Sequence, residues 1–287
     1  MTAAKIKCHQ RTIRECEEQS QKRELFGDWW KGINTDKKNS CVKIISRETA
    51  EKIILKYEWL QTLPANYFQY VGLFFGGNIG GAACFTRVKF GGKFKMFGDD
   101  AICLGRGACA FWCPPWSGSH LVSSACKLIA NQIGKPTYFV AFSDWAAGEI
   151  GTIYQACGWT YLGHKQSKEY TNNSGDRLDI NTPRVRAVSG FERRKNPDLR
   201  PTKEQIKSEH EKILADGYRI TLGPMRGKYC CVYGKSGKQK RAMIKNLLAV
   251  SREYPKRIAS EVSKAIQPVI QPEGRGDEST TTLQFAH

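Results

Sequence analysis

The sequence predicts a mixed α/β fold, in which a β-sheet is flanked by helices and followed by a basic C-terminal extension. Two apolar runs, 67–75 and 82–88, are joined by the glycine-rich segment 76–81, which is typical of an antiparallel hairpin. A strand at 138–142, a short helix ending near Cys157 and a strand at 159–163 then form a strand–helix–strand unit. An antiparallel hairpin followed by such a unit indicates a mixed sheet.

The segments before the hairpin are predicted to be an extension and a helix. Residues 1–45 are polar and mixed in charge, and we expect an N-terminal extension that partly docks on the core. Ser46 can cap a helix that runs to about Leu60. Tyr57 and Leu60 belong to the apolar face of this helix.

The segments after the hairpin supply a strand, a loop and a helix. Residues 101–112 form an apolar run that predicts a buried strand, interrupted by Gly105-Arg106-Gly107. A loop rich in proline, glycine and serine follows at 113–119. It leads into an amphipathic helix from about His120 to Ile133, which Gly134-Lys135-Pro136 ends.

Positive charge is concentrated behind this core. The formal net charge is +18, and residues 181–260 alone carry +13. A segment this basic favours contact with a nucleic-acid backbone over a merely solvated surface. The predicted units are therefore the extension, a catalytic core at 46–180, a basic region at 181–266 that completes the core and contacts DNA, and a disordered tail at 267–287. Within the basic region, patterns predict a helix at 203–215, strands at 218–222 and 229–233, and a basic helix after Lys235.

Neither an export signal nor a membrane span is predicted. The N-terminus lacks the apolar core of a signal peptide, and the uncharged stretch 64–86 contains a glycine-rich turn at its centre. We therefore expect a soluble cytoplasmic protein. The eleven cysteines form no C-x-x-C pair, and the five histidines form no paired-ligand motif. A metal held by residues distant in sequence stays an open alternative.

Arg106 is the first candidate functional residue, because it lies inside an apolar strand. A buried guanidinium is costly unless a carboxylate or a bound anion compensates it. One interpretation is a salt bridge to a core carboxylate such as Asp144. The other is contact with an anionic ligand.

The loop before the 120–133 helix is the second candidate. Backbone N–H groups at a helix N-terminus attract phosphate groups, and Ser117 and Ser119 add hydroxyl donors. Ordinary helix capping by Ser119 is the alternative. Nearby Cys109 and Cys113 are expected to pack in the core.

Asp144 and Tyr154 form the third candidate. Asp144 lies at the C-terminal end of a predicted strand, where open α/β sheets place their sites. Tyr154 follows ten residues later in the short helix. A phenol with a pKa near ~10 suits a general acid, and Asp144 suits a base or a hydrogen-bond partner of an exocyclic amine. Taken alone, Tyr154 is also typical of a core tyrosine.

The order of strand, loop, helix, strand and tyrosine-bearing helix over 101–163 resembles the acyl-CoA half of the GNAT acyltransferase superfamily. Two phrases, LGRGACAFWCPPWSGSHLVSSACKLI and FVAFSDWAAGEIGTIYQACGWTYLG, more closely resemble the Mom family of phage DNA-modification proteins. The resemblance covers about 67–163 and extends more loosely into KYCCVYGKSGKQKRAMIKN. It implies a GNAT-like mixed sheet.

The resemblance also implies an activity. It is the conversion of adenine in DNA to N6-(1-acetamido)-adenine, or methylcarbamoylation, which protects phage DNA from restriction endonucleases in the bacterial host. Acetyl-CoA is the implied cofactor, and an iron ion has been proposed. Arg106, Ser119, Asp144 and Tyr154 match the expected active-site residues, with Arg106, Ser117 and Ser119 at the cofactor. Simple transfer from a thioester would leave an acetyl group on N6, so the donor stays open.

The substrate is expected to be double-stranded DNA with a flipped adenine, because N6 is paired in a duplex. Trp112, Trp116 and Trp145 are candidates for stacking on that base, or for a core role. The expected phosphate contacts are Arg184, Arg186, Arg193, Arg194, Lys235, Lys238, Lys240 and Arg241. Two alternatives remain: a conventional acetyl-CoA-dependent N-acetyltransferase acting on protein, tRNA or a small amine, and a DNA-binding protein on a degenerate acyltransferase scaffold.

Overall fold

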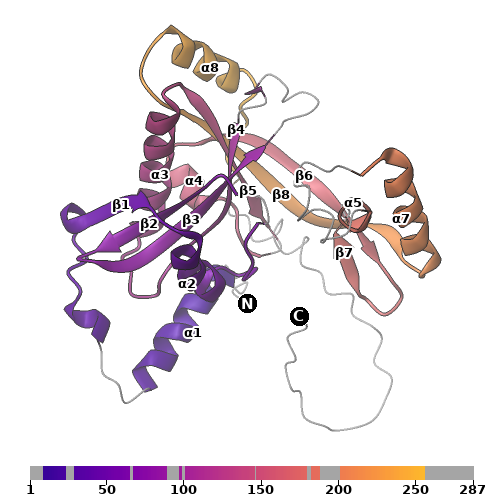
Figure 1. Cartoon of the computed structure of the whole chain (residues 1–287), viewed down its shortest axis with the longest axis horizontal. Helices are drawn as coiled ribbons and strands as arrows, with labels where there is room; N and C mark the ends of the chain where they lie inside the picture. The colour runs from indigo at the N-terminus through magenta and orange to yellow at the C-terminus, as the bar shows by residue number, and fades with distance from the viewer. Residues whose placement is uncertain are drawn as a thin grey trace, which may run out of the picture.

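The computed structural model describes residues 9–23, 29–64, 67–88, 97–98, 101–145, 147–179, 182–187 and 201–255. An eight-stranded mixed sheet organises them in the order β1-β2-β3-β4-β5-β8-β6-β7 (Figure 1), which confirms the predicted α/β class. The strands are β1 (Ser40–Ile44), β2 (Gln69–Phe75), β3 (Asn78–Val88), β4 (Ala101–Cys109), β5 (Thr137–Asp144), β6 (Thr160–Thr171), β7 (Arg177–Asp179) and β8 (Arg219–Tyr233). The helices are α1 (His9–Arg23), α2 (Arg47–Tyr57), α3 (Ser117–Ile133), α4 (Thr152–Ala156), α5 (Thr182–Arg186), α7 (Lys203–Ala215) and α8 (Lys238–Leu248), with short 3-10 turns at Trp29–Gly32 and Lys37–Asn39.

The predicted hairpin is present and is tighter than expected. β2 and β3 pair antiparallel from Gln69↔Phe85 to Phe75↔Asn78, so only Gly76 and Gly77 form the turn. Both glycines have positive φ (+53° and +91°), which a two-residue hairpin turn requires. The segment 78–81, predicted to be part of the loop, belongs instead to β3.

β4 and β5 form the only parallel pair among the described strands, and their pairing is short. It covers Ile102↔Phe139, Cys103↔Val140 and Leu104↔Ala141. Gly105 is then skipped in the register with β3, which passes from Phe85↔Leu104 to Cys84↔Arg106. The bulge bends β4 away from β5. Beyond Leu104 and Ala141 the two strands therefore diverge, and each leaves one edge without a strand partner.

The prediction of two separate strands at 218–222 and 229–233 is wrong, because residues 219–222 and 229–233 all belong to β8. β8 is one strand, which pairs antiparallel with β5 on one side and with β6 on the other. Gly227 marks a close approach and not a break, because a Cβ there would lie 2.6 Å from Ser143 Oγ. β6 is also longer than the predicted 159–163. The two strands continue past the end of β5 as an arm that carries β7, α5 and α7 (Figure 1).

Helices α2 and α3 pack on the sheet, and their ends differ from the prediction. Ser46 caps α2 by accepting a hydrogen bond from Thr49 N (3.3 Å), as expected. The helix ends at Tyr57, and Leu60 lies beyond it with 39% of its surface exposed. α3 begins at Ser117, three residues before the predicted start. α7, in contrast, has the predicted bounds, 203–215.

Two apolar clusters hold these layers together. The main cluster lies between the sheet and helices α2 and α3, and its largest fully buried side chains include Trp159, Tyr70 and Phe85. A smaller cluster docks α8 through Leu247 against Tyr138 near the start of β5, where Tyr138 Oη donates a hydrogen bond to the Met243 carbonyl (3.1 Å). No helix in the described part of the chain is both long and apolar enough to cross a bilayer.

Residues of the predicted extension contact the core, chiefly through β1 and α1. β1 is the edge strand of the sheet, paired with β2 from Ser40↔Phe75 to Ile44↔Val71. α1 lies against β4 and the segment after it. Gln10 Nε2 donates to the Gly107 carbonyl (2.8 Å), and Arg14 donates to the carbonyls of Phe111 (3.2 Å) and Cys113 (2.8 Å). The predicted tail at 267–287 falls outside the described residues.

Candidate active site

A cavity of about 1900 Å³ opens where β4 and β5 diverge. Its inner wall consists of 103–109 on β4 and 142–144 on β5. The other walls come from α1, the end of α2, the start of α3, the 148–154 segment and the facing parts of β6 and β8. A cavity at a break in the sheet, near the carboxyl ends of two parallel strands, is a typical location for an active site.

Asp144 and Tyr154 both line this cavity. Asp144 is the last residue of β5, lies opposite Arg226 of β8, and is half-buried. Its carbonyl accepts a hydrogen bond from Glu149 N (3.0 Å), which closes the turn that leads to α4. α4 then places Tyr154 with its ring centroid 5.3 Å from Trp159 and 5.1 Å from Tyr229. The structure thus brings the predicted pair to one cavity.

The environment of Tyr154 determines which proton chemistry it can perform. Burial and the nearby Glu149 carboxylate raise the pKa of the Tyr154 hydroxyl well above its ordinary value. The hydroxyl therefore stays protonated at any physiological pH. Tyr154 is suited to donate a hydrogen bond or a proton, and unsuited to act as a base.

Arg106 lines the cavity, and its partner is not the one suggested by the sequence. Its Nε lies 3.9 Å from Glu58 Oε2, whereas Asp144 was the expected carboxylate. Its other nitrogens donate to the Gly105 carbonyl (2.7 Å) and to Thr62 Oγ1 (3.4 Å). Glu58 lies directly after α2, far from Arg106 in sequence, so no local pattern pointed to it. Nε has no hydrogen-bond partner within the described structure, and only two of the five N–H groups of the guanidinium donate, so donors remain for a ligand.

Arg106→Gln should destabilise the fold in a pH-dependent way. Burial raises the pKa of the Glu58 carboxyl, and the Arg106 charge opposes that shift. A carboxyl whose pKa is raised by folding costs stability once the pH rises above its unfolded-state pKa, and without Arg106 that cost grows. We expect the free energy of unfolding to fall by about 1–3 kcal/mol at pH 7 and the loss to shrink as the pH falls toward about 4. Urea denaturation of both proteins at pH 7 and at about pH 4 measures this difference in the free energy of unfolding.

Arg11→Gln is the matched control for this prediction. Arg11 also pairs with a glutamate, Glu15 (3.1 Å), but its side chain is 74% exposed. Its replacement should leave the urea midpoint nearly unchanged at either pH. Equal effects of the two variants, or a loss at Arg106 that does not depend on pH, would contradict the role of Glu58.

Ser117 and Ser119 do not lie in the cavity wall, although the loop that carries them does. Pro115 and Gly118 line the cavity at the start of α3. Ser117 is buried, and Ser119 Oγ donates to the Trp116 carbonyl (3.0 Å) instead of capping the helix. The helix starts before Ser119, so the alternative interpretation, helix capping by Ser119, is wrong. This segment therefore contributes backbone at the N-terminus of α3 to the cavity wall.

The cysteines near the cavity are unreactive thiols. Cys103, Cys109 and Cys113 line its inner wall and are buried. Burial raises the pKa of Cys103 to about 12 and that of Cys109 to about 11. Cys113 donates from Sγ to the Gly80 carbonyl (2.9 Å). Thiols that stay protonated at neutral pH are poor nucleophiles, and these three side chains pack in the apolar core.

The tryptophans expected to stack on a base pack elsewhere. Trp112 and Trp116 each contact Phe75 at 5.7 Å between ring centroids, and Trp145 is buried against His164 at 4.9 Å. None of the three lines the cavity described here. The exposed aromatic side chain that does is Phe142, with 44% of its surface accessible. Its place in the apolar run 138–142 made it look like a core residue.

Of the predicted phosphate contacts, the structure describes only part, and those lie apart from the cavity. Lys235, Lys238, Lys240 and Arg241 follow β8 near the start of β5, at the opposite end from Asp144. Arg184 and Arg186 lie in α5 on the arm, while Arg193 and Arg194 fall outside the described residues. The cations that do line the cavity on the arm side are Lys165, Lys168, Arg226 and Lys228. The sequence did not single these out.

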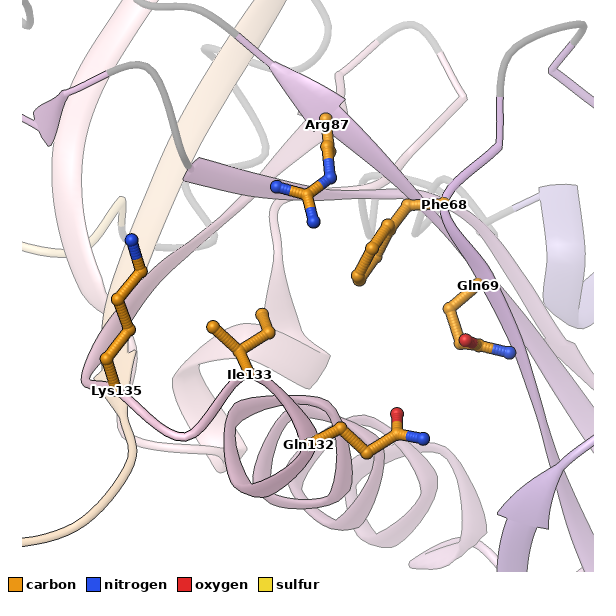
Figure 2. A pocket seen from close by; sticks show the side chains of 6 residues that line it. All are labelled: Phe68, Gln69, Arg87, Gln132, Ile133 and Lys135. Carbon is orange, nitrogen blue, oxygen red and sulfur yellow. The ribbon is translucent and has the colours of Figure 1, made fainter.

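A second, smaller pocket of about 480 Å³ lies between the β2–β3 pair and the end of α3. Figure 2 shows Arg87 and Phe68 across the hollow from Ile133 and Gln132, with Lys135 at one side. The Arg87 guanidinium lies over the Phe68 ring at 4.3 Å. Its lining includes no carboxylate, imidazole, thiol or phenol, so the larger cavity is the candidate active site.

The described residues do not fit a resident iron ion. Among them, no three histidine, cysteine, aspartate or glutamate side chains gather into a metal-binding group.

Comparison with known protein families gives one result. The family model described as the Mom protein family matches residues 39–221. The match includes β1 through most of the arm and contains Arg106, Asp144 and Tyr154, while α1 lies before it. The search of curated proteins returned no match.

Proposed function

Because the chain belongs to the Mom protein family of phage DNA-modification proteins, we propose that it converts adenine in DNA to N6-(1-acetamido)-adenine. The observation that carries the proposal is the cavity between the diverging β4 and β5, which holds Asp144 and Tyr154 together within the family match. The modification would protect the DNA from restriction endonucleases.

The donor is proposed to be an acyl-CoA bound at the divergence of the two strands, as in a GNAT-like fold. The edge of β4 beyond Leu104 no longer pairs with β5, so its backbone groups are placed to pair with an extended amide-bearing chain. The N-terminus of α3, which reaches the cavity at Pro115 and Gly118, suits a pyrophosphate. Arg106, which lines the cavity, adds positive charge nearby. An acetyl group alone would leave N6-acetyl-adenine. When bound, the donor would therefore have to supply a glycine-like acyl group, whose two carbons and one nitrogen make up the acetamido group while the thiol of CoA leaves.

Asp144 and Tyr154 are proposed to handle the protons. Adenine N6 is a weak nucleophile, and a carboxylate at hydrogen-bond distance would orient the amine and accept its proton. Tyr154, which stays protonated, would donate to the leaving group or to a developing oxyanion. The adenine must leave the duplex to reach either group.

Tyr154→Phe tests the proposal in cells. DNA from cells that express the wild-type chain should contain an adenine nucleoside heavier by one acetamido group, as measured by mass spectrometry after digestion. The phenylalanine variant should lower its amount about 100-fold, because the ring packing is kept and the proton donor is lost. Tyr67→Phe, at a half-exposed tyrosine that does not line the cavity, should leave the amount unchanged.

The same measurement separates the proposal from the alternatives. A nucleoside heavier by an acetyl group would indicate ordinary N-acetylation of DNA. Unmodified DNA from cells with abundant folded protein would refute the proposal and favour a conventional N-acetyltransferase or a DNA-binding protein without activity. Wild-type levels of the nucleoside in the Tyr154→Phe variant would refute only the role of the phenol.

A further inference from the structure

A basic surface extends from the cavity along the β6–β8 arm. β5 ends at Asp144, opposite Arg226, while β6 and β8 stay paired as far as Thr171↔Arg219. The arm therefore projects past the site that contains Asp144 (Figure 1). Four of its cations line the cavity, and we call them the basic track: Lys165, Lys168, Arg226 and Lys228.

Within the basic track, Lys165, Lys168 and Arg226 carry charge that is poorly compensated in the described part of the chain. Lys165 lies directly opposite Arg226 in the β6–β8 register, where like charges repel each other, while Asp144 of β5 lies opposite Arg226 on its other side and offsets part of its charge. Within the described structure, neither of them nor Lys168 forms an ion pair with a carboxylate. Some cations elsewhere on the arm are paired, as in Arg177–Glu169 (3.6 Å) and Lys212–Glu209 (2.6 Å). A bound polyanion would relieve the repulsion.

Phe142 lies at the junction of the track and the site. It precedes Asp144 by two residues on β5, so both side chains leave the same face of the strand. The ring is 44% exposed, and Lys228 Nζ lies 5.5 Å from its centroid. An exposed aromatic ring beside cations is the usual platform for stacking a nucleobase next to a bound backbone.

We propose that the basic track and Phe142 bind the DNA strand that carries the target adenine. The four cations contact phosphates, and Phe142 stacks on a base beside the site. This inference rests on the proposed function for the identity of the polyanion. The track lies away from the α8 cluster, by which we mean Lys235, Lys238, Lys240 and Arg241. Thr137 pairs with Tyr233 and Asp144 pairs with Arg226, so the two ends of β5 lie about 23 Å apart.

Two matched double charge reversals test the track. Lys165→Glu/Arg226→Glu changes the cavity, and Lys238→Glu/Arg241→Glu makes the same change in charge at α8. The affinity for a fluorescent duplex of about 20 base pairs is measured by anisotropy at several salt concentrations. The track pair should weaken binding about 10- to 100-fold and lower the salt dependence by about two phosphate contacts. The α8 pair should have a clearly smaller effect on both.

Equal losses in the two pairs, or a larger loss in the α8 pair, would overturn the track. If the reversal prevents folding, the milder Lys165→Gln/Arg226→Gln pair replaces it, with Lys238→Gln/Arg241→Gln as its control and the same ordering of effects expected. The modified nucleoside in DNA from cells with the wild-type chain is measured independently of binding, because it tests the proposed activity. If cells with the wild-type chain contain modified DNA but the track variant binds DNA normally, the basic track is refuted and the proposed activity is not. If binding depends on the track but cells with the wild-type chain contain no modified DNA, the proposed activity is refuted and the track is not.

Phe142 has its own test. Phe142→Leu removes the π-face and keeps an apolar side chain, and should lower affinity for the same duplex about 5- to 100-fold. Phe142→Trp should restore binding. Leu214→Ala, at a 41% exposed residue of α7 outside the cavity wall, should leave affinity unchanged. Loss of binding in both Phe142 variants, or in neither, would contradict a stacking role.

Discussion

Asp144→Asn is expected to reduce DNA modification by about 100- to 10,000-fold while the protein stays folded. The change keeps the size of the side chain and one acceptor oxygen, and it removes the negative charge that accepts a proton. Asp144 ends β5 at the point where the strand has separated from β4, and its side chain borders the cavity. The measurement is the amount of modified adenine nucleoside in DNA from cells with equal protein levels.

A matched substitution controls for the change of charge itself. Asp216→Asn makes the same chemical change at the exposed end of α7, outside the cavity wall, and should leave the modification at the wild-type level. DNA affinity distinguishes catalysis from binding, because Asp144→Asn removes a negative charge beside the basic track and should not weaken binding. Modification at wild-type levels in Asp144→Asn would exclude this carboxylate as base or orienting group.

Local sequence patterns predicted the elements whose signals are themselves local. The glycine pair between two apolar runs predicted the β2–β3 hairpin, and the serine before an amphipathic run predicted the start of α2. The apolar run 138–142 predicted a strand whose end lies within two residues of Asp144, the observed end of β5. Asp144 and Tyr154 could be predicted as site residues from such local patterns, because both lie within one strand–helix unit.

Local sequence patterns do not determine which strands become neighbours in the sheet. β8 inserts between β5 and β6, and this pairing brings Arg226 and Lys228 beside Lys165. The basic track therefore depends on contacts between residues about 60 positions apart, whereas the α8 cluster is visible as a run of lysines. The same limit applies to Arg106, whose partner Glu58 reaches it from the end of another element. Total charge indicated a polyanion, and only the sheet order shows which cations reach the cavity.

Gly151→Ala should destabilise the fold by about 2–4 kcal/mol and lower DNA modification more than 10-fold. Gly151 has a φ of +77°, and a Cβ there would lie 2.3 Å from the Tyr229 ring. Tyr229 donates a hydrogen bond to the Ile150 carbonyl and packs against Tyr154, so its displacement moves the proposed proton donor.

Gly158→Ala separates the two causes of this loss, because Gly158 also has a positive φ (+69°) but no atom lies within 4 Å of its Cβ position. It should cost only about 1 kcal/mol, the conformational part, and leave the modification unchanged. Thermal unfolding and the nucleoside measurement, made on both variants, give the difference. A difference of at least about 1 kcal/mol, with activity lost only in Gly151→Ala, attributes the effect to the collision with Tyr229. Equal stabilities and equal activities would mean that Tyr229 yields without moving Tyr154, and that the packing of these two rings does not position the phenol.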